Sequence, residues 1–432
     1  MYPGLMRGRF LLQTLFGDAV ALLLGLAAAS LVVFRTPLPW QSNLGLGNSI
    51  WPLVGLLGAG LLLGSYMSLR MWLQTTPRAS YGRAMAIVGI AGAFTAVGLV
   101  ISREYFSRPF LGYTLATWLV GSLAIRAVRR RRPWVERVVL VTGEKGLVDD
   151  LRLSQHLDVE SVFDPAGDPP ASPLDLDSTL VVDLRPVMSE RMAQFVASSN
   201  LAGQGLRSLT SIYEEHTGRL PLVHLAEGWE LSAPVSRNQY ADFKRSIDFV
   251  LTVLTAPLWL ALGGLIWLAV KLDSRGPAIY TQQRVGHDGS TFTLYKFRTM
   301  VLDAESNGPR FAAAGDDRLT RVGRYLRRIR LDEIPQLWNV LKGDLSLVGP
   351  RPERPVWTEQ FEETIPFYGY RHLIRPGVTG WAQINYGYAD DEADTVEKLT
   401  FDLYYVKHMS LWLDLRILGS SMWTVLSGFG AR

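Results

Sequence analysis

The 432-residue chain contains no cysteine. Disulfide bonds, thiolate zinc sites, iron–sulfur clusters and cysteine nucleophiles are therefore excluded, because each of them needs a thiol. Charged residues are also scarce, at 19% of the chain against about 25% in an average soluble protein. Hydrophobic residues make up 48% of the chain, and much of this content lies near the N-terminus. This composition argues against a disordered chain, a fibrous repeat and a wholly soluble enzyme.

Four apolar stretches lie in the first third of the chain: Phe10–Phe34, Ser49–Leu69, Ala84–Ile101 and Phe110–Val128. Each is close to the roughly 20 residues that a helix needs to cross a bilayer. A cleavable signal peptide would explain only the first stretch, so we expect a four-helix transmembrane region over residues 1–130. Basic residues gather before the first stretch, between the second and third, and after the fourth. The positive-inside rule therefore places both ends of this region in the cytoplasm.

Residues 131–235 have the composition of a soluble module. Arg137–Val141 and Thr179–Asp183 are rich in Val and Leu and are expected to be buried strands, separated by polar and helical segments. This alternation predicts a small parallel α/β layer. A dinucleotide-binding fold needs Gly-x-Gly-x-x-Gly after its first strand, whereas this chain keeps only Gly143-x-x-Gly146. We interpret the module as a degenerate Rossmann-like domain that packs or dimerises.

Phe249–Val270 is a fifth apolar stretch, and Pro257 interrupts it. Proline removes a backbone donor and kinks a helix. Basic residues flank both ends, so a complete crossing would place one basic pair on the disfavoured side of the membrane. The pattern favours a re-entrant membrane helix over residues 246–271 that bends at Pro257 and returns to the same face. A kinked complete crossing is the alternative.

Basic side chains are dense after the fifth stretch. Lys296 and Arg298 end an expected strand, where they could clamp a phosphate or form a solvated edge. An expected helix follows, and its arginines could form a solvated face or contact anionic headgroups and phosphates. Beside a membrane region we favour the second reading. These arginines are Arg318, Arg321, Arg324, Arg327, Arg328 and Arg330.

Asp332 and Glu333 directly follow these arginines, and Pro335 suits the first turn of a helix. The two acids could simply cap that helix. Alternatively, one carboxylate can attack phosphorus while its neighbour holds Mg²⁺, which reduces the repulsion between an anionic nucleophile and a phosphate. Adjacent acids beside many arginines are what phosphoryl transfer between two anionic substrates needs.

The C-terminal part of the chain carries a series of motifs in order: Tyr295–Arg298, Asp317–Gly323, Leu331–Leu341, Lys342–Glu353, Arg375–Ile384 and Asp402–Tyr405. Together they resemble the bacterial sugar transferase family of monotopic polyprenyl-phosphate glycosyl-1-phosphate transferases. The resemblance covers about residues 240–432. The four apolar stretches and the α/β module ahead of it resemble the large, initiating members of the family.

The resemblance implies a membrane protein of α and α/β class, with a phosphoglycosyl transferase domain over residues 236–432. It implies transfer of a hexose-1-phosphate, with glucose or galactose as the sugar, from a UDP-sugar to undecaprenyl phosphate with release of UMP. This would be the first membrane step of exopolysaccharide, O-antigen or capsule biosynthesis. The enzyme would lie in the bacterial inner membrane, with its catalytic domain on the cytoplasmic face.

The resemblance also assigns roles to residues. Asp332 would form an aspartyl phosphosugar intermediate, and Glu333 would be its metal-associated neighbour, so that both acids bind Mg²⁺. The family bend usually carries Ser-Pro, where this chain has Ala256-Pro257. The expected phosphate contacts are Lys296, Arg298, Arg327, Arg328, Arg351 and Arg375.

Membrane lipids are further expected partners, and no nucleic acid is expected. The sequence does not decide whether the protein forms a homodimer. The alternative is a non-catalytic membrane assembly or regulatory protein of the polysaccharide pathway. Retention of both acids and of the arginines weighs against that alternative.

Overall fold

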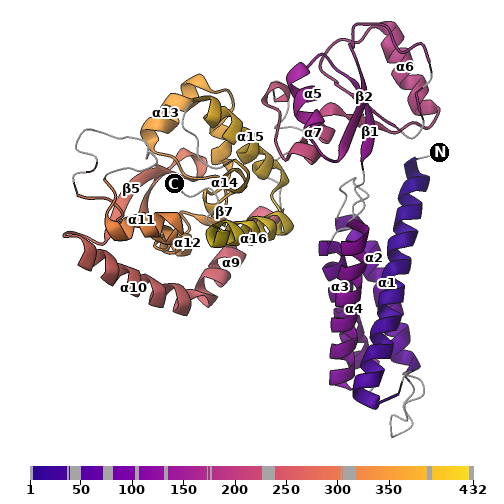
Figure 1. Cartoon of the computed structure of the whole chain (residues 1–432), viewed down its shortest axis with the longest axis horizontal. Coiled ribbons are helices and arrows are strands. Elements are labelled where there is room, and N and C mark those ends of the chain that lie inside the picture. Colours follow the sequence, from indigo (N-terminus) through magenta and orange to yellow (C-terminus); the bar gives the residue numbers. More distant parts are fainter. Residues whose placement is uncertain are drawn as a thin grey trace. The chain divides into compact units, whose positions relative to one another are not determined.

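The computed structural model describes residues 3–36, 38, 50–71, 81–102, 107–130, 135–172, 174–175, 178–225, 239–302, 304, 318–386 and 392–427. The chain folds into two compact units, Met1–Leu209 and Thr210–Arg432 (Figure 1). The domain boundaries expected next to residues 131 and 235 fall in segments 131–134 and 226–238, which lie outside the described residues.

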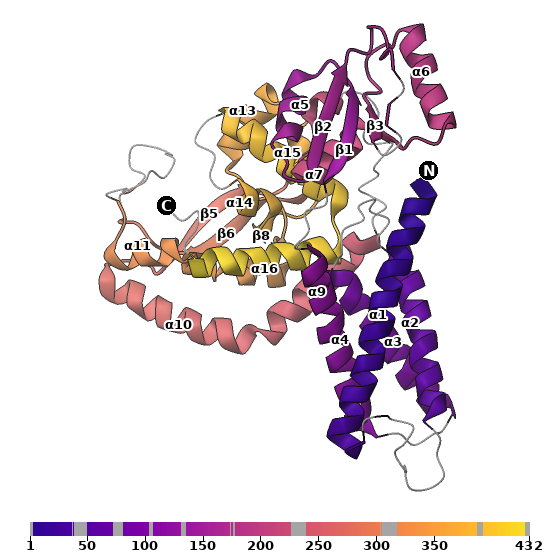
Figure 2. The same ribbon diagram turned by 45° about the vertical axis from the view of Figure 1, so that its right-hand side comes forward.

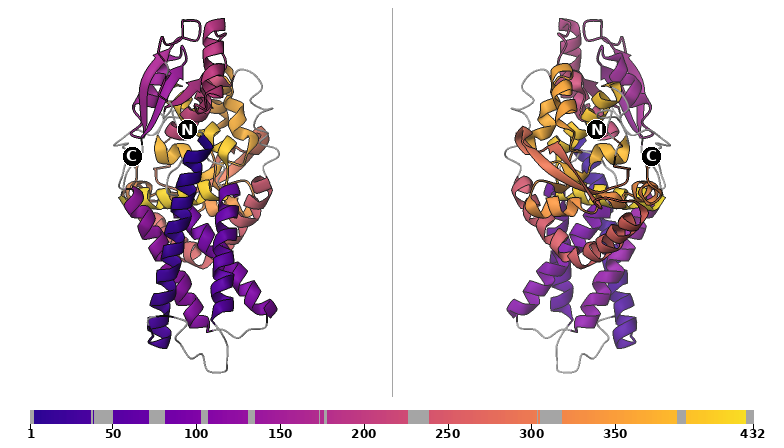
Figure 3. Two further views of the ribbon diagram at one scale, coloured as in Figure 1. Left: turned by 90° about the vertical axis from the view of Figure 1, so that its right-hand side faces the viewer. Right: turned by 90° about the vertical axis from the view of Figure 1, so that its left-hand side faces the viewer.

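The first unit begins with α1 (Pro3–Phe34), α2 (Trp51–Met71), α3 (Tyr81–Ser102) and α4 (Arg108–Arg130). They run side by side, with α1 against α4 and α2 against α3 (Figures 1 and 3). Small residues allow a close approach, since a Cβ added to Gly60 would lie 2.8 Å from the Cα of Ala91. The four apolar stretches are thus confirmed as helices.

A buried ion pair links two of the described helices of this bundle. Asp18 on α1 accepts hydrogen bonds from Arg126 (Nη2 to Oδ2, 2.8 Å) and Ser122 (Oγ to Oδ1, 2.8 Å) on α4. All three residues are buried. A buried carboxylate needs such partners, because an unpaired charge in an apolar interior is costly. The pair therefore links α1 to α4, and this structural role explains the presence of Asp18 in an apolar helix.

The α/β part of the first unit contains a four-stranded parallel sheet in the order β2-β1-β3-β4. The central strands bury most of their side chains, which explains why they appear as runs of Val and Leu. The predicted parallel α/β layer is confirmed. Its elements are β1 (Glu136–Val141), α5 (Lys145–Arg152), β2 (Leu157–Phe163), β3 (Thr179–Val182), α6 (Glu190–Leu201) and β4 (Leu206–Ser208).

The second unit is mainly helical, and α7 (Leu209–Thr217) leads into it. Its strands β5 (Ile279–Val285) and β6 (Thr291–Phe297) form an antiparallel hairpin, and β7 (Ser346–Val348) pairs with β8 (Gly377–Thr379) in parallel. Its other helices are α9 (Gln239–Leu254), α10 (Ala256–Asp273), α11 (Arg321–Arg328), α12 (Gln336–Lys342), α13 (Pro355–Thr364), α14 (Trp381–Asn385), α15 (Glu392–His408) and α16 (Leu411–Ser427), with 3₁₀ turns η5 (Leu331–Glu333) and η6 (Tyr368–Leu373).

The segment expected as one bent helix consists of two, α9 and α10. They meet at an open angle whose concave side faces α11, α12 and α16 (Figures 1 and 2). The break lies at Thr255, and Pro257 lies in the first turn of α10. The hydroxyl of Thr255 donates to the carbonyl of Leu251 (2.8 Å), and the indole of Trp259 donates to the carbonyl of Thr252 (3.0 Å). Side chains thus satisfy carbonyls near the break, as an apolar environment requires.

Five described helices are long and apolar enough to cross a membrane, namely α1 to α4 and α10. One face of α10 packs against protein, because Leu262, Ile266 and Val270 join a cluster with Phe297 and Ile334. A spacing of four residues places these three side chains along one face. The exposed apolar side chains of α10 are Leu258, Leu260, Leu265, Trp267, Leu268 and Leu272.

Candidate active site

Asp332 and Glu333 lie in the 3₁₀ turn η5, between α11 and α12. Arg330, just before this turn, has a left-handed backbone (φ +55°), which costs a residue with a side chain roughly 1–2 kcal/mol. Strain of this kind collects at functional sites. Pro335 occupies the N-cap position of α12, and no side-chain hydrogen bond caps that helix. Helix capping therefore does not explain the two acids.

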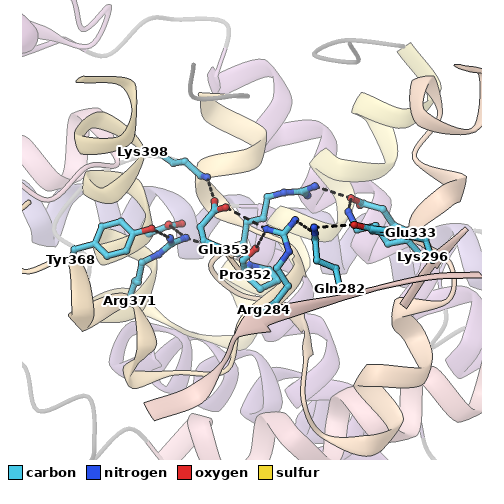
Figure 4. A network of polar contacts seen from close by, with 12 residues as sticks. Gln282, Arg284, Lys296, Glu333, Pro352, Glu353, Tyr368, Arg371 and Lys398 are labelled. Atoms are coloured by element: carbon cyan, nitrogen blue, oxygen red, sulfur yellow. Dashed lines mark hydrogen bonds and ion pairs between the residues drawn. The ribbon is translucent and has the colours of Figure 1, made fainter. Parts of the chain in front are cut away.

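The two acids are both buried but differ in their partners. Glu333 Oε1 pairs with Lys296 Nζ (3.3 Å), as Figure 4 shows, and it also pairs with Arg351 Nη2 (3.1 Å). Within the described part of the chain, the carboxylate of Asp332 forms neither a hydrogen bond nor an ion pair, although the residue is only 8% exposed. The site therefore combines one carboxylate that two cations anchor with one that has no polar partner among the described residues.

The surroundings push the pKa values of the two acids apart. Burial, followed by the charge of Glu333, raises the pKa of Asp332 above its usual range, although Lys296 opposes the shift. Burial also acts to raise the pKa of Glu333, but Arg351 and Lys296 outweigh it and hold that pKa well below its usual range. Opposite shifts in neighbouring acids indicate different roles. Glu333 stays ionised, and Asp332 is the more basic carboxylate and thus the stronger nucleophile when ionised.

Three of the six cations predicted to contact phosphate lie near this pair. Lys296 reaches Glu333 from β6, and Arg351 reaches it from the loop after β7. Arg327 on α11 donates from Nε to the hydroxyl of Thr299 (3.0 Å), and its charge lowers the pKa of Asp332. The three side chains come from separate parts of the sequence, and together they supply positive charge on the approach to the acids.

The other three predicted cations make no contact with either acid in the described structure. Arg298 donates to the carbonyl (2.9 Å) and hydroxyl (2.8 Å) of Ser274, after α10. Arg375 is exposed and donates to the carbonyl of Gly343 (3.2 Å), and Arg328 is exposed on α11. Their contact with phosphates stays a prediction.

Several buried residues that shape the site were not predicted from the sequence. The amide of Asn339 on α12 donates to the carbonyl of Thr293 (2.7 Å) and accepts from the backbone of Tyr295 (3.2 Å). These bonds fix α12 to β6, the strand that carries Lys296. Buried ion pairs also surround Glu353, which closes the motif Lys342–Glu353. The position of the Glu353 carboxylate at the end of this motif was the signal from which its role in the site could have been predicted.

The two acids suit Mg²⁺. The described residues contain no group of three or more His, Asp or Glu side chains that could hold a metal ion. Mg²⁺ is, however, often bound by one or two carboxylates, with water and substrate phosphates completing its six ligands. Because both cations use Oε1 of Glu333, the Oε2 atom and the carboxylate of Asp332 remain as ligands.

Comparison with known proteins matches residues 239–428 to the family described as bacterial sugar transferase. A putative undecaprenyl-phosphate N-acetylgalactosaminyl 1-phosphate transferase of Bacillus subtilis (strain 168) is 47% identical over 133 residues, which cover 31% of this chain and 74% of the relative. This chain belongs to the bacterial sugar transferase family. The resemblance seen in the motifs is thereby confirmed, and the matched range contains Asp332 and Glu333.

Two larger relatives match this chain over shorter shares of their own length. The UDP-N-acetylgalactosamine-undecaprenyl-phosphate N-acetylgalactosaminephosphotransferase of Aeromonas hydrophila is 44% identical over 254 residues, or 59% of this chain and 60% of the relative. The UDP-glucose:undecaprenyl-phosphate glucose-1-phosphate transferase of Escherichia coli (strain K12) is 44% identical over 190 residues, 43% of this chain and 40% of the relative. The chain thus spans about half the length of these two relatives.

Proposed function

We propose that this sugar transferase moves a sugar-1-phosphate from a UDP-sugar to undecaprenyl phosphate and releases UMP. The observation that carries the proposal is the buried carboxylate of Asp332, which has no polar partner in the described structure, beside Glu333, which two cations anchor. The names of the curated relatives describe the same class of transfer. The reaction would begin the assembly of an exopolysaccharide, O-antigen or capsule at the membrane.

In the first step, a carboxylate oxygen of Asp332 attacks the phosphorus that bears the sugar. The bond from this phosphorus to the bridging oxygen breaks, UMP leaves with the electron pair, and the phosphosugar stays on Asp332. Lys296, Arg327 and Arg351 bind the diphosphate and offset the charge that develops on its oxygens. Asp332 and Glu333 would hold Mg²⁺, which supplies further neutralisation of phosphate charge when bound.

In the second step, a phosphate oxygen of undecaprenyl phosphate attacks the same phosphorus. The bond between that phosphorus and the Asp332 oxygen breaks, so the carboxylate is regenerated and a polyprenyl diphosphate sugar is formed. No net proton transfer is needed in either step, because an anionic oxygen attacks and an anionic oxygen leaves. This is consistent with a site that is rich in cations and lacks a histidine partner for Asp332 among the described residues.

A donor screen tests this proposal. The full-length protein in liposomes containing undecaprenyl phosphate and Mg²⁺ would receive UDP-glucose, UDP-galactose or UDP-N-acetylgalactosamine, the last because two relatives are named for it. We expect at least one donor to yield UMP together with a lipid-linked phosphosugar. Release of UDP would instead mean that the sugar alone is transferred, and no release with any donor would favour the non-catalytic alternative.

We further propose that α9 and α10 re-enter the membrane from the cytoplasmic face of the bacterial inner membrane, while α1 to α4 cross it. Both ends of the α9–α10 segment are held by the same globular domain. At the start, Lys244 pairs with Asp414, and at the end Asp273 Oδ2 accepts from the backbone of Val322 (3.0 Å). A domain on one side of the membrane can hold both ends only if the segment returns.

The middle of α10 supports the same topology. A Cβ added to Gly263 would lie 3.7 Å from Ile334 Cγ2, and Ile334 directly follows Glu333. The catalytic turn therefore contacts the centre of an apolar helix. This contact would bring the reacting carboxylate close to the membrane surface, where the phosphate of a polyprenyl carrier lies.

Cysteine labelling in intact cells tests the re-entrant topology. The chain has no cysteine, so Arg275→Cys after α10, Asp149→Cys in the α/β module and Ser107→Cys before α4 would each introduce a unique thiol. We expect an impermeant maleimide to label Ser107→Cys and to spare Asp149→Cys and Arg275→Cys until the cells are opened. Labelling of Arg275→Cys in intact cells would mean that α10 crosses the membrane.

A further inference from the structure

The loop that carries Arg351 to Glu333 is held in place along its whole length. In each of five consecutive residues of this loop, 349–353, a backbone atom forms a hydrogen bond with another segment of the same domain. These bonds are Gly349 N to Thr379 O (2.9 Å), Gly377 N to Pro350 O (2.9 Å), Arg371 Nη2 to Arg351 O (2.8 Å), Arg284 Nη1 to Pro352 O (3.0 Å) and Val285 N to Glu353 O (2.9 Å).

Arg371 is the side chain that holds Arg351 itself. It is 3% exposed, and its Nη2 donates both to the Arg351 carbonyl (2.8 Å) and to Asp402 Oδ2 (2.8 Å). Its Nη1 donates to the hydroxyl of Tyr368 (2.6 Å), as Figure 4 shows. A guanidinium presents its donors in a rigid planar fork. Asp402 and Tyr368 therefore set the angle at which the remaining donor meets Arg351.

The far end of the loop is held by a second set of charges. Glu353 pairs with Lys398 (2.7 Å) on α15, the helix that also carries Asp402, and with Arg284 (3.5 Å) on β5 (Figure 4). In the described structure, neither Glu353 nor Arg371 contacts the two catalytic acids. An effect of these residues on the reaction would therefore pass through the loop.

We infer that Arg371, oriented by Asp402, is a positioning residue that fixes the backbone of Arg351 and thereby keeps the Arg351 guanidinium on Glu333 and at the substrate phosphates. The inference rests on the proposed function, which requires the charge of Arg351 at a fixed place. Burial of a full ion pair behind a loop is costly, and here it provides a rigid support. Misplacement of a reacting group by about 1 Å can cost about 10²-fold in rate.

A double-mutant cycle tests this role, with Arg371→Lys, Arg351→Gln and the double variant compared for kcat and KM by UMP release. Lysine keeps the charge, but its single ammonium cannot reproduce the fixed fork. We expect Arg371→Lys to lower kcat about 10- to 100-fold, with a smaller change in the KM for UDP-sugar. In the Arg351→Gln background the same change should cost less than about threefold, because the positioned group is gone.

Arg219→Lys is the matched control, since Arg219 also pairs with α15, through Glu397 (2.5 Å), but does not hold the loop. It should keep nearly the full rate. Thermal unfolding shows whether Arg371→Lys is folded. If it is not, Asp402→Asn replaces it in the same cycle, because the Asp402 substitution leaves Arg371 in place and weakens its anchor. Equal losses in both Arg351 backgrounds, or no loss at all, would overturn the inference.

Failure of this inference can be distinguished from failure of the proposed function. If Asp332→Asn is inactive while the effects of the Arg371 and Arg351 substitutions simply add, the proposed transfer reaction is supported and only the positioning role of Arg371 is wrong. If Asp332→Asn retains UMP release, the proposed catalytic step itself is wrong.

Discussion

Replacement of Asp332 by Asn should lower UMP release by at least about 10³-fold, because an amide of the same shape carries no charge and cannot attack phosphorus. Asp332 has no hydrogen-bond or ion-pair partner among the described residues, so the substitution breaks no native polar contact. The variant should therefore fold and keep a native unfolding temperature. Initial rates of UMP release in liposomes, together with thermal unfolding, would measure both effects.

Asp288→Asn is a suitable control for this experiment, because Asp288 is an exposed aspartate beside His287. The same chemical change there should leave the rate of UMP release unchanged. More than about a tenth of native activity in Asp332→Asn would rule out this residue as the nucleophile, since loss of a covalent catalyst costs far more than tenfold.

Replacement of Glu333 by Gln has the second-largest expected effect, a fall in kcat of at least about 10²-fold. The neutral amide is a poorer ligand for Mg²⁺ and no longer neutralises Lys296 and Arg351. We therefore expect the Mg²⁺ concentration for half-maximal activity to rise about 10- to 100-fold, and a chelator to abolish UMP release by the native protein. A Mg²⁺ titration of UMP release measures both.

Glu353→Gln separates this effect from lost stability. Glu353 also pairs with two buried cations, and Lys398 and Arg284 lie near it rather than near Asp332. Removal of one partner from a buried ion pair destabilises a protein by about 3–5 kcal/mol, so both variants should unfold at lower temperature. The Mg²⁺ requirement should shift in Glu333→Gln alone. Native activity in the presence of chelator would contradict the metal-associated role.

The sequence was informative where the signal is local. A run of apolar residues of membrane-spanning length predicted α1 to α4, because length and hydrophobicity are properties of one segment. The central strands β1 and β3 were likewise evident, since burial on both faces selects Val and Leu. Asp332 and Glu333 were assigned a role through the ordered motifs around them, because two adjacent acids beside arginines also suit the start of a helix.

Positions that depend on distant contacts were not predictable. Lys296 and Arg298 were expected to end one strand, but β6 ends at Phe297, and the Arg298 side chain binds Ser274. Arg371 lies 20 residues from Arg351 and 31 from Asp402, so no periodicity connects them. The bonds of Thr255 and Trp259 at the helix break also depend on geometry that composition does not encode.

The most direct test of the central claim is covalent trapping. The protein would be incubated with UDP-sugar labelled on the sugar-bearing phosphate, without undecaprenyl phosphate, then quenched and digested for peptide mapping. We predict label on the peptide that contains Asp332, none in Asp332→Asn, and transfer of the label to lipid when undecaprenyl phosphate is added. Release of UMP with no label ever attached to Asp332 would contradict the account, because it would mean direct transfer from donor to lipid.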